Sequence, residues 1–155
     1  MSSQVLSEQS TSVQAFVTLL RAHAAATRRL SAQLTADHGL TINDFEVLLR
    51  LARAPDRRMR RVDLAEQVVL TASGITRLLD GLERGGYVER DSCSSDRRVV
   101  YAVLTEAGLA QVAEAAASHF AQVDEMFGAR FEEAELDELA SLLSRLGETD
   151  VELPC

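Results

Sequence analysis

The chain has 155 residues, of which 46% are hydrophobic and 26% charged, and its formal net charge is −8 at pH 7. This length suits a single domain with a sizeable core, here residues 1–155. No apolar run approaches the roughly 20 residues of a membrane-spanning helix, and the polar N-terminus lacks the pattern of a secretion signal. We therefore expect a cytoplasmic protein, and its two cysteines, Cys93 and Cys155, are too few for a disulfide framework.

The acidic net charge is unevenly distributed along the chain. Residues 1–52 hold four arginines and four acids, residues 53–105 hold ten arginines and eight acids, and residues 106–155 hold two arginines and twelve acids. Binding of phosphate groups depends on the local field rather than on net charge. The middle segment is therefore the part of the chain that could contact nucleic acid.

The first two predicted elements are helices. A long helix over 12–37 has apolar residues along one side and ends at His38-Gly39, where glycine favours termination and His38 is expected to interact with the helix dipole. The second begins at Thr41, which with Asp44 nearly matches a capping box, and it ends before Pro55. Its predicted apolar face consists of Phe45, Leu48, Leu49 and Ala52.

A helix over 71–84 follows a basic segment at 57–61 and a short third helix. The third helix has Leu64, Ala65 and Val68 as predicted core positions. In the next helix, large aliphatic residues recur at i, i+3, i+4 and i+7, which predicts one buried face formed by Ile75, Leu78, Leu79 and Leu82. The opposite face begins with small polar residues and one arginine, which is typical of a recognition helix in the major groove.

A hairpin is predicted after Gly85-Gly86 ends this helix, with strands over 87–90 and 99–104. The intervening loop is polar and ends in adjacent arginines, Arg97 and Arg98. Arginines at the end of such a loop can enter a narrow, electronegative minor groove, which is the function of a wing. The order helix, turn, helix, hairpin predicts a winged helix-turn-helix lobe over 41–104.

Two further helices complete the predicted fold, which is mainly α with a small β-hairpin wing. Thr105-Glu106 opens a long periodic helix, and a last helix covers about 132–147. A small winged core cannot cover the apolar faces of three long flanking helices. We therefore expect the segments 12–37 and 106–147 to pair two chains into a homodimer.

Several short motifs identify the chain as similar to a known family. They are Leu40-Thr41, Val62-Asp63-Leu64-Ala65, Thr76-Arg77-Leu78-Leu79-Asp80, Leu82-Glu83-Arg84-Gly85-Gly86, Val88-Glu89-Arg90, Asp96-Arg97-Arg98 and Leu104-Thr105-Glu106-Ala107-Gly108. In this combination the sequence resembles the MarR (multiple-antibiotic-resistance regulator) family of winged-helix transcription factors over roughly residues 12–147. The resemblance implies a homodimer that binds a pseudo-palindromic DNA operator, mostly as a repressor, and responds to small phenolic or anionic effectors.

The resemblance also assigns DNA-binding roles by position. Ser73, Thr76 and Arg77 correspond to major-groove residues, Arg97 to the wing arginine in the minor groove, and Asp96 to the acid that orients it. Thr71, Gly74 and Arg98 complete the predicted contact set, although many family members have a larger residue at the position of Gly74. Phosphate contacts, which position a protein without specifying sequence, are predicted for Arg60 and Arg61, unless acids such as Asp63 pair with them.

The predictions for a sensing site are less specific. The family's effector cleft lies between the dimerisation helices and the DNA-binding lobe, and its candidate residues here are His23, Arg28, Phe45 and His119. Cys93 lies near wing arginines that could lower its pKa and make it a redox switch, although an incidental exposed thiol is the simpler interpretation.

No metal cluster, cofactor motif, phosphate loop or nucleophile motif is evident in the sequence, so we expect neither a cofactor nor an enzyme. Two alternatives remain open. One is a winged-helix protein-interaction module without specific DNA binding, and the other is a thiol redox-responsive regulator acting through Cys93.

Overall fold

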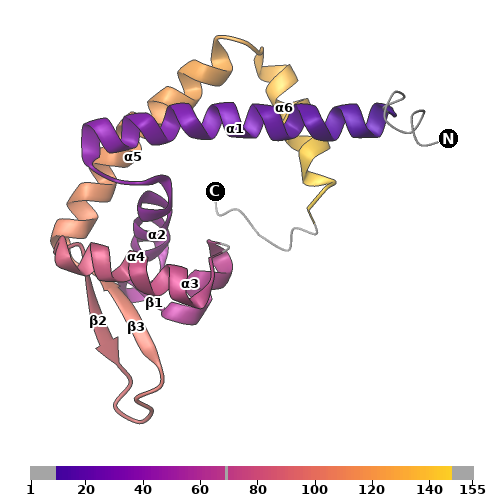
Figure 1. The fold of residues 1–155 in the computed structure, drawn as a ribbon. Helices are drawn as coiled ribbons and strands as arrows, with labels where there is room; N and C mark the ends of the chain where they lie inside the picture. Colours follow the sequence, from indigo (N-terminus) through magenta and orange to yellow (C-terminus); the bar gives the residue numbers. More distant parts are fainter. Residues whose placement is uncertain (1–9, 69, 148–155) are drawn as a thin grey trace. The chain divides into compact units, whose positions relative to one another are not determined.

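The computed structural model describes residues 10–68 and 70–147. They form two compact units, one that runs through His119 and one that begins at Phe120. Helices predominate, and a three-stranded antiparallel sheet lies in the first unit (Figure 1). The predicted fold class, mainly α with a small wing, is confirmed. None of the described helices is both long and apolar enough to cross a membrane.

The first two helices begin and end close to where the sequence predicts. Helix α1 (Thr11–His38) is followed by Gly39, which has a left-handed φ of 66°. Helix α2 (Ile42–Arg53) has the predicted capping box: the Thr41 hydroxyl accepts the backbone N–H of Asp44 at 3.1 Å, and the Asp44 carboxylate accepts the N–H of Thr41 at 2.9 Å. These caps satisfy backbone groups that have no partner within a helix.

Strand β1 (Arg58–Arg60) was not predicted from the sequence. It follows a short 3-10 turn (Pro55–Arg57) and pairs antiparallel with β3 (Val100–Leu104), so that Arg58 faces Val103 and Arg60 faces Tyr101. Three residues, two of them charged, show no alternating pattern. The strand exists because a distant segment supplies its hydrogen-bond partners.

Helices α3 (Arg61–Gln67) and α4 (Ala72–Arg84) form the predicted helix-turn-helix pair. The aliphatic stripe of α4 packs as predicted, with Ile75, Leu79 and Leu82 buried and Leu78 partly buried against the same core. The predicted core positions of α3 are also buried. The apolar face of α4 thereby fixes which of its residues face outward.

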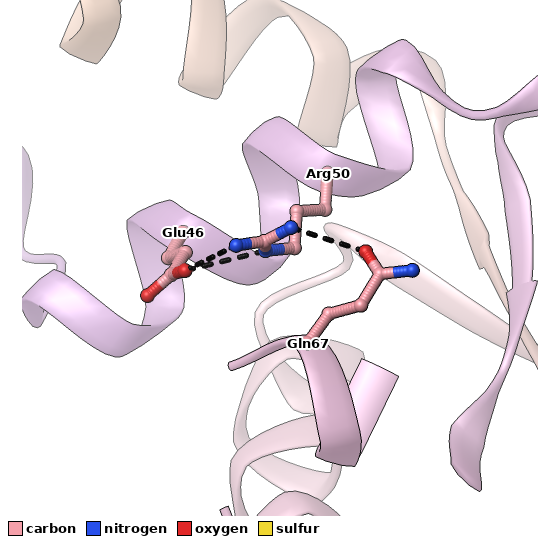
Figure 2. Close-up of polar contacts among 3 residues, drawn as sticks. All are labelled: Glu46, Arg50 and Gln67. Atoms are coloured by element: carbon pink, nitrogen blue, oxygen red, sulfur yellow. Dashed lines mark hydrogen bonds and ion pairs between the residues drawn. The ribbon is translucent and has the colours of Figure 1, made fainter. Parts of the chain in front are cut away.

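A polar contact joins α2 to the end of α3 (Figure 2). The guanidinium of Arg50 bonds Glu46 on its own helix, at 2.8 and 3.2 Å, and donates a further hydrogen bond to the side-chain oxygen of Gln67 at 3.1 Å. Because Gln67 is the last residue of α3, this bond links α2 to the C-terminal end of that helix.

Strand β2 (Val88–Ser92) pairs antiparallel with β3, and the sheet order is β1-β3-β2. The β2–β3 hairpin extends beyond α3 and α4 (Figure 1). Helix α5 (Glu106–Gly128) follows directly, and its first turn touches the backbone of the wing. A Cβ atom placed on Gly108 would lie only 2.1 Å from the carbonyl oxygen of Tyr87, so the close approach requires glycine.

The second unit holds the end of α5 and helix α6 (Glu133–Ser144), within the range predicted for the last helix. A capping box of Glu132 and Glu135 begins α6. The rings of Phe127 and Phe131 lie 6.2 Å apart at the turn between the two helices. No residue of α6 is buried, and its apolar side chains are therefore available to another surface.

Candidate nucleic-acid interface

The start of α4 presents a small polar surface built around its cap. The Thr71 hydroxyl accepts the backbone N–H of Gly74 at 3.1 Å and lies 3.3 Å from the hydroxyl of Ser73. The Thr76 hydroxyl donates to the carbonyl of Ala72 at 2.8 Å. These hydrogen bonds to neighbouring residues of α4 hold the hydroxyl groups in defined orientations. Direct readout of bases requires hydrogen-bonding groups that are oriented in this way.

The cap of α4 leaves little room for a side chain at Gly74. A Cβ atom at this position would lie 3.1 Å from the hydroxyl oxygen of Thr71, closer than an ordinary van der Waals contact. A larger residue would therefore press on the group that caps α4. The glycine also leaves the outer surface of the first turn open to close approach by a ligand backbone.

Arg77 lies one turn further along the same face and is exposed. Its guanidinium makes no ion pair or hydrogen bond with any residue in the described parts of the chain. A free guanidinium fork can bond both acceptors on the major-groove edge of guanine. Of the predicted recognition-helix residues, Thr71, Ser73 and Arg77 are exposed, and Gly74 and Thr76 are partly buried.

A second arginine joins the recognition helix to the wing. Arg90 on β2 pairs with Asp80 and, at 3.1 Å, with Glu83, both on the outer side of α4. Arg58 on β1 similarly pairs with Asp91 at 3.2 Å and lies over the ring of Tyr101 at 4.1 Å. Sequence reasoning named Arg90 only as part of a motif, although two acids at i and i+3 on an outward helix face indicate a basic partner.

The wing loop is organised by Asp96. Its carboxylate accepts the backbone N–H of Arg98 at 3.0 Å, and its carbonyl accepts the N–H of Val99 at 3.1 Å. The side chain of Arg97 is exposed and forms no ion pair with any described residue. The carboxylate thus shapes the loop backbone here, while the predicted orientation of Arg97 by Asp96 stays a prediction.

The basic segment before α3 divides into paired and free arginines. Arg60 forms two 2.8 Å bonds to Asp63, and this hydrogen-bonded charge raises the pKa of Arg60. Arg57 pairs with Glu106 at 2.7 Å. Arg61 has no such partner among residues 10–68 and 70–147. Of the two predicted phosphate contacts, Arg60 is paired with Asp63 and Arg61 is not. Arg61 is therefore the stronger candidate for a contact with a DNA phosphate.

Cys93 is partly buried in the wing loop, and its sulfur lies 3.0 Å from the hydroxyl of Ser95. This hydrogen bond and the backbone N–H groups of Ser95 and Asp96 lower the pKa of the thiol. The direction of this pKa shift agrees with the prediction, but hydrogen bonds cause it and not the wing arginines that the sequence suggested. The redox role of Cys93 stays a prediction. Cys155 lies outside the described residues.

Of the four effector-cleft candidates, the structure brings together two. The rings of Phe45 and His119 lie 4.7 Å apart, with Phe45 buried, and burial lowers the pKa of His119. His23 and Arg28 are exposed on α1. His38, expected at a helix dipole, also bonds the Ser118 hydroxyl at 2.6 Å and so ties α1 to α5.

The lowered pKa of His119 predicts a loss of stability in mild acid. The unfolded chain takes up a proton near pH 6.5, whereas the folded chain takes it up only at lower pH, so stability is fully present above that value and falls as pH decreases. We expect the midpoint temperature of thermal unfolding to decrease as the pH is lowered from about 7.5 to about 5.5. In His119→Gln this fall should be smaller. Equal pH dependence in the wild type and in His119→Gln would contradict the assignment.

Comparisons with known proteins place this geometry in a family. The MarR family model matches residues 40–100, which span the helix-turn-helix and most of the wing. The HTH-type transcriptional repressor YetL of Bacillus subtilis (strain 168) is 32% identical over 113 residues, 73% of this chain and 67% of YetL. The HTH-type transcriptional regulator MhqR of the same organism is 29% identical over 136 residues, 88% of this chain and 91% of MhqR.

Solved structures agree with these relatives. AbsC, a MarR family transcriptional regulator from Streptomyces coelicolor, has 33% sequence identity and a TM-score of 0.81, covering 90% of this chain and 94% of AbsC. Sco3205 from the same organism, solved in complex with DNA, has 26% identity and a TM-score of 0.82, covering 90% of this chain and 88% of Sco3205. The chain therefore belongs to the MarR family, and it is a DNA-binding transcriptional regulator rather than an enzyme.

Proposed function

We propose that the protein is a homodimeric repressor that binds a pseudo-palindromic operator and is released from it by a small phenolic or anionic effector. One observation carries the DNA-binding part of this proposal. The outward face of α4 carries the free guanidinium of Arg77, and the neighbouring wing carries that of Arg97, so a single lobe presents one group for each groove. The name of the relative YetL supports repression.

The operator follows from the symmetry of a dimer. Two identical lobes related by a two-fold axis bind two inverted half-sites, whose centres lie about 34 Å, or one helical turn, apart. Selection of bound sequences from random duplex DNA tests this directly. We expect an inverted repeat with that spacing. Recovery of unrelated sequences would instead favour a winged-helix module that binds another protein.

The dimer rests on apolar side chains that the single chain leaves exposed. On α1, Val13, Phe16 and Leu20 follow a helical stripe and are 44%, 59% and 50% exposed. In the second unit, Leu142 and Leu146 are 47% and 74% exposed. Apolar stripes on successive turns of long helices are typical of surfaces that pair with another copy.

Phe16→Glu is expected to convert the dimer into monomers, because it places a charge within the apolar stripe of α1. Light scattering coupled to size exclusion would show the mass of two chains for the wild type and of one chain for the variant. Thr18→Glu adds the same charge on the other side of α1 and should remain dimeric. A Phe16→Glu protein with the mass of two chains would exclude this stripe from the interface.

Release by an effector requires different affinities for the DNA-competent and DNA-incompetent dimers. Phe45 and His119 are the first residues to test, because their rings meet between α2 and α5. Operator titrations with and without a series of phenolic acids measure the effect. If none of these acids shifts the titration, phenolic release is excluded and the protein is a constitutive regulator toward them.

A further inference from the structure

An open cleft with two free arginines lies between the start of α3 and the wing. It is lined by Arg60, Arg61, Val62, Arg98, Val99 and Val100 and has a volume of about 120 Å³. Pairing of β1 with β3 produces it, since Arg60 faces Tyr101 and the chain beyond Arg60 therefore passes the beginning of β3. Residues 60–62 thereby form one wall of the cleft and residues 98–100, almost 40 positions later in the sequence, form the other.

The cleft carries a net positive charge that the protein itself does not neutralise. Arg60 is held by both carboxylate oxygens of Asp63, at 2.8 Å each. The side chains of Arg61 and Arg98 form no ion pair with any residue that the structure describes. Two guanidinium groups that share a cleft repel one another unless an anion lies between them. The cleft is therefore suited to bind one anionic group.

The apolar residues indicate what kind of anion fits. Val62 is 56% exposed at the edge of the cleft, and Val99 and Val100 contribute its other apolar surface. A cavity of about 10–15 Å³ holds one water molecule, so there is room for a phosphate group and part of a sugar. The cleft also belongs to the lobe that presents Arg77 and Arg97 to DNA. A phosphodiester with its deoxyribose matches both the charge and the apolar surface.

We propose that Arg61 and Arg98 together bind one backbone phosphate of the operator in each half-site, with the three valines against the adjoining sugar. The proposal rests on the proposed function and divides the two wing arginines between different tasks. Arg97 reaches the minor groove, whereas Arg98 turns back toward α3. The shared phosphate then ties the wing to the helix-turn-helix when DNA is bound.

The salt dependence of operator binding tests this phosphate clamp. Each neutralised phosphate contributes about 0.9 to the slope of log affinity against log salt. If Arg61 and Arg98 share one phosphate per half-site, Arg61→Ala/Arg98→Ala should lower the slope of the dimer by about 1.8, and each single variant by less than that. Arginines on separate phosphates would lower it by about 1.8 singly and about 3.6 together, which would overturn the clamp.

Two controls separate the possible outcomes. Arg145→Ala removes one positive charge per chain from the acidic second unit, as each single variant does from the cleft, and should leave the slope unchanged. Random-sequence DNA should lose as much affinity as the operator in the double variant, because phosphate contacts do not read sequence. If the wild type binds its operator specifically but the double variant shows the same salt dependence of affinity, the clamp is refuted and the proposed function stands. Absence of specific binding by the wild type would refute the proposed function instead.

Inorganic phosphate distinguishes the source of the anion. Side-chain resonances of Arg61 and Arg98 can be followed by NMR in full-length protein during titration with phosphate and, separately, with operator DNA. We expect operator DNA to shift both resonances, and phosphate to shift them weakly and to compete with DNA. Shifts with inorganic phosphate alone, together with an unchanged salt slope in the double variant, would identify a free-anion site and overturn the clamp.

Discussion

Gly108→Ala is expected to lower the free energy of unfolding by about 3 kcal/mol, the upper end of the range for overpacked sites. The added Cβ atom would lie 2.1 Å from the carbonyl oxygen of Tyr87 and 2.7 Å from a methyl carbon of Leu104. The first of these atoms belongs to the backbone and cannot rotate away. Either α5 or the start of β2 must move, and urea denaturation followed by circular dichroism measures the loss.

The matched control is Gly81→Ala, a glycine in the interior of α4. A Cβ atom there meets nothing within 4 Å. Alanine is favoured over glycine within a helix by about 0.5–1 kcal/mol, so this variant should be slightly more stable than the wild type. Equal stability of Gly108→Ala and Gly81→Ala would show that α5 does not rest on the wing backbone as closely as described.

Arg77→Ala is expected to reduce operator affinity by about 5- to 150-fold for each half-site, corresponding to about 1–3 kcal/mol for a bidentate contact with guanine. Both half-sites of a dimer lose the contact, so the total effect is larger. Because the loss concerns base reading, affinity for random DNA should change little. Fluorescence anisotropy with operator and random duplexes of equal length gives both numbers.

Two further substitutions sharpen this result. Arg77→Lys keeps the charge but loses the planar fork, and should recover only part of the specificity. Arg84→Ala removes an arginine from the last turn of α4, where its side chain bonds the Asp80 carbonyl at 3.3 Å, and should bind the operator nearly normally. An equal loss for operator and random DNA in Arg77→Ala would identify Arg77 as a phosphate contact instead.

The elements with strong periodicity or capping could be predicted from the sequence. The stripe of α4 repeats over two turns and fixes both its helical form and its buried side, and the box of Thr41 and Asp44 marks the start of α2. Both signals are local, because neighbouring residues in the sequence produce them. The wing was predictable for the same reason, since a polar loop of turn-forming residues separates Tyr87-Val88 from the apolar run over 99–104.

Features that depend on distant segments could not be predicted. Strand β1 is stabilised by pairing with β3, about 40 residues later, and its own residues carry no pattern. The gathering of Arg61 and Arg98 in one cleft is a consequence of that pairing. The pair of Arg60 and Asp63 could be expected because the two residues are three positions apart. The partners of Arg90 could not, because they depend on how β2 packs beside α4.

The ion pairs of Arg90 bear on the release by an effector that we propose. They join β2 to Asp80 and Glu83 of α4 and so link the wing to the recognition helix within one lobe. We propose that an effector acting on the long helices leaves each lobe able to recognise its half-site and instead alters the distance and rotation between the two lobes of the dimer. Release would then appear as a changed preference for half-site spacing, and an operator with a lengthened or shortened spacer could regain binding in the presence of effector.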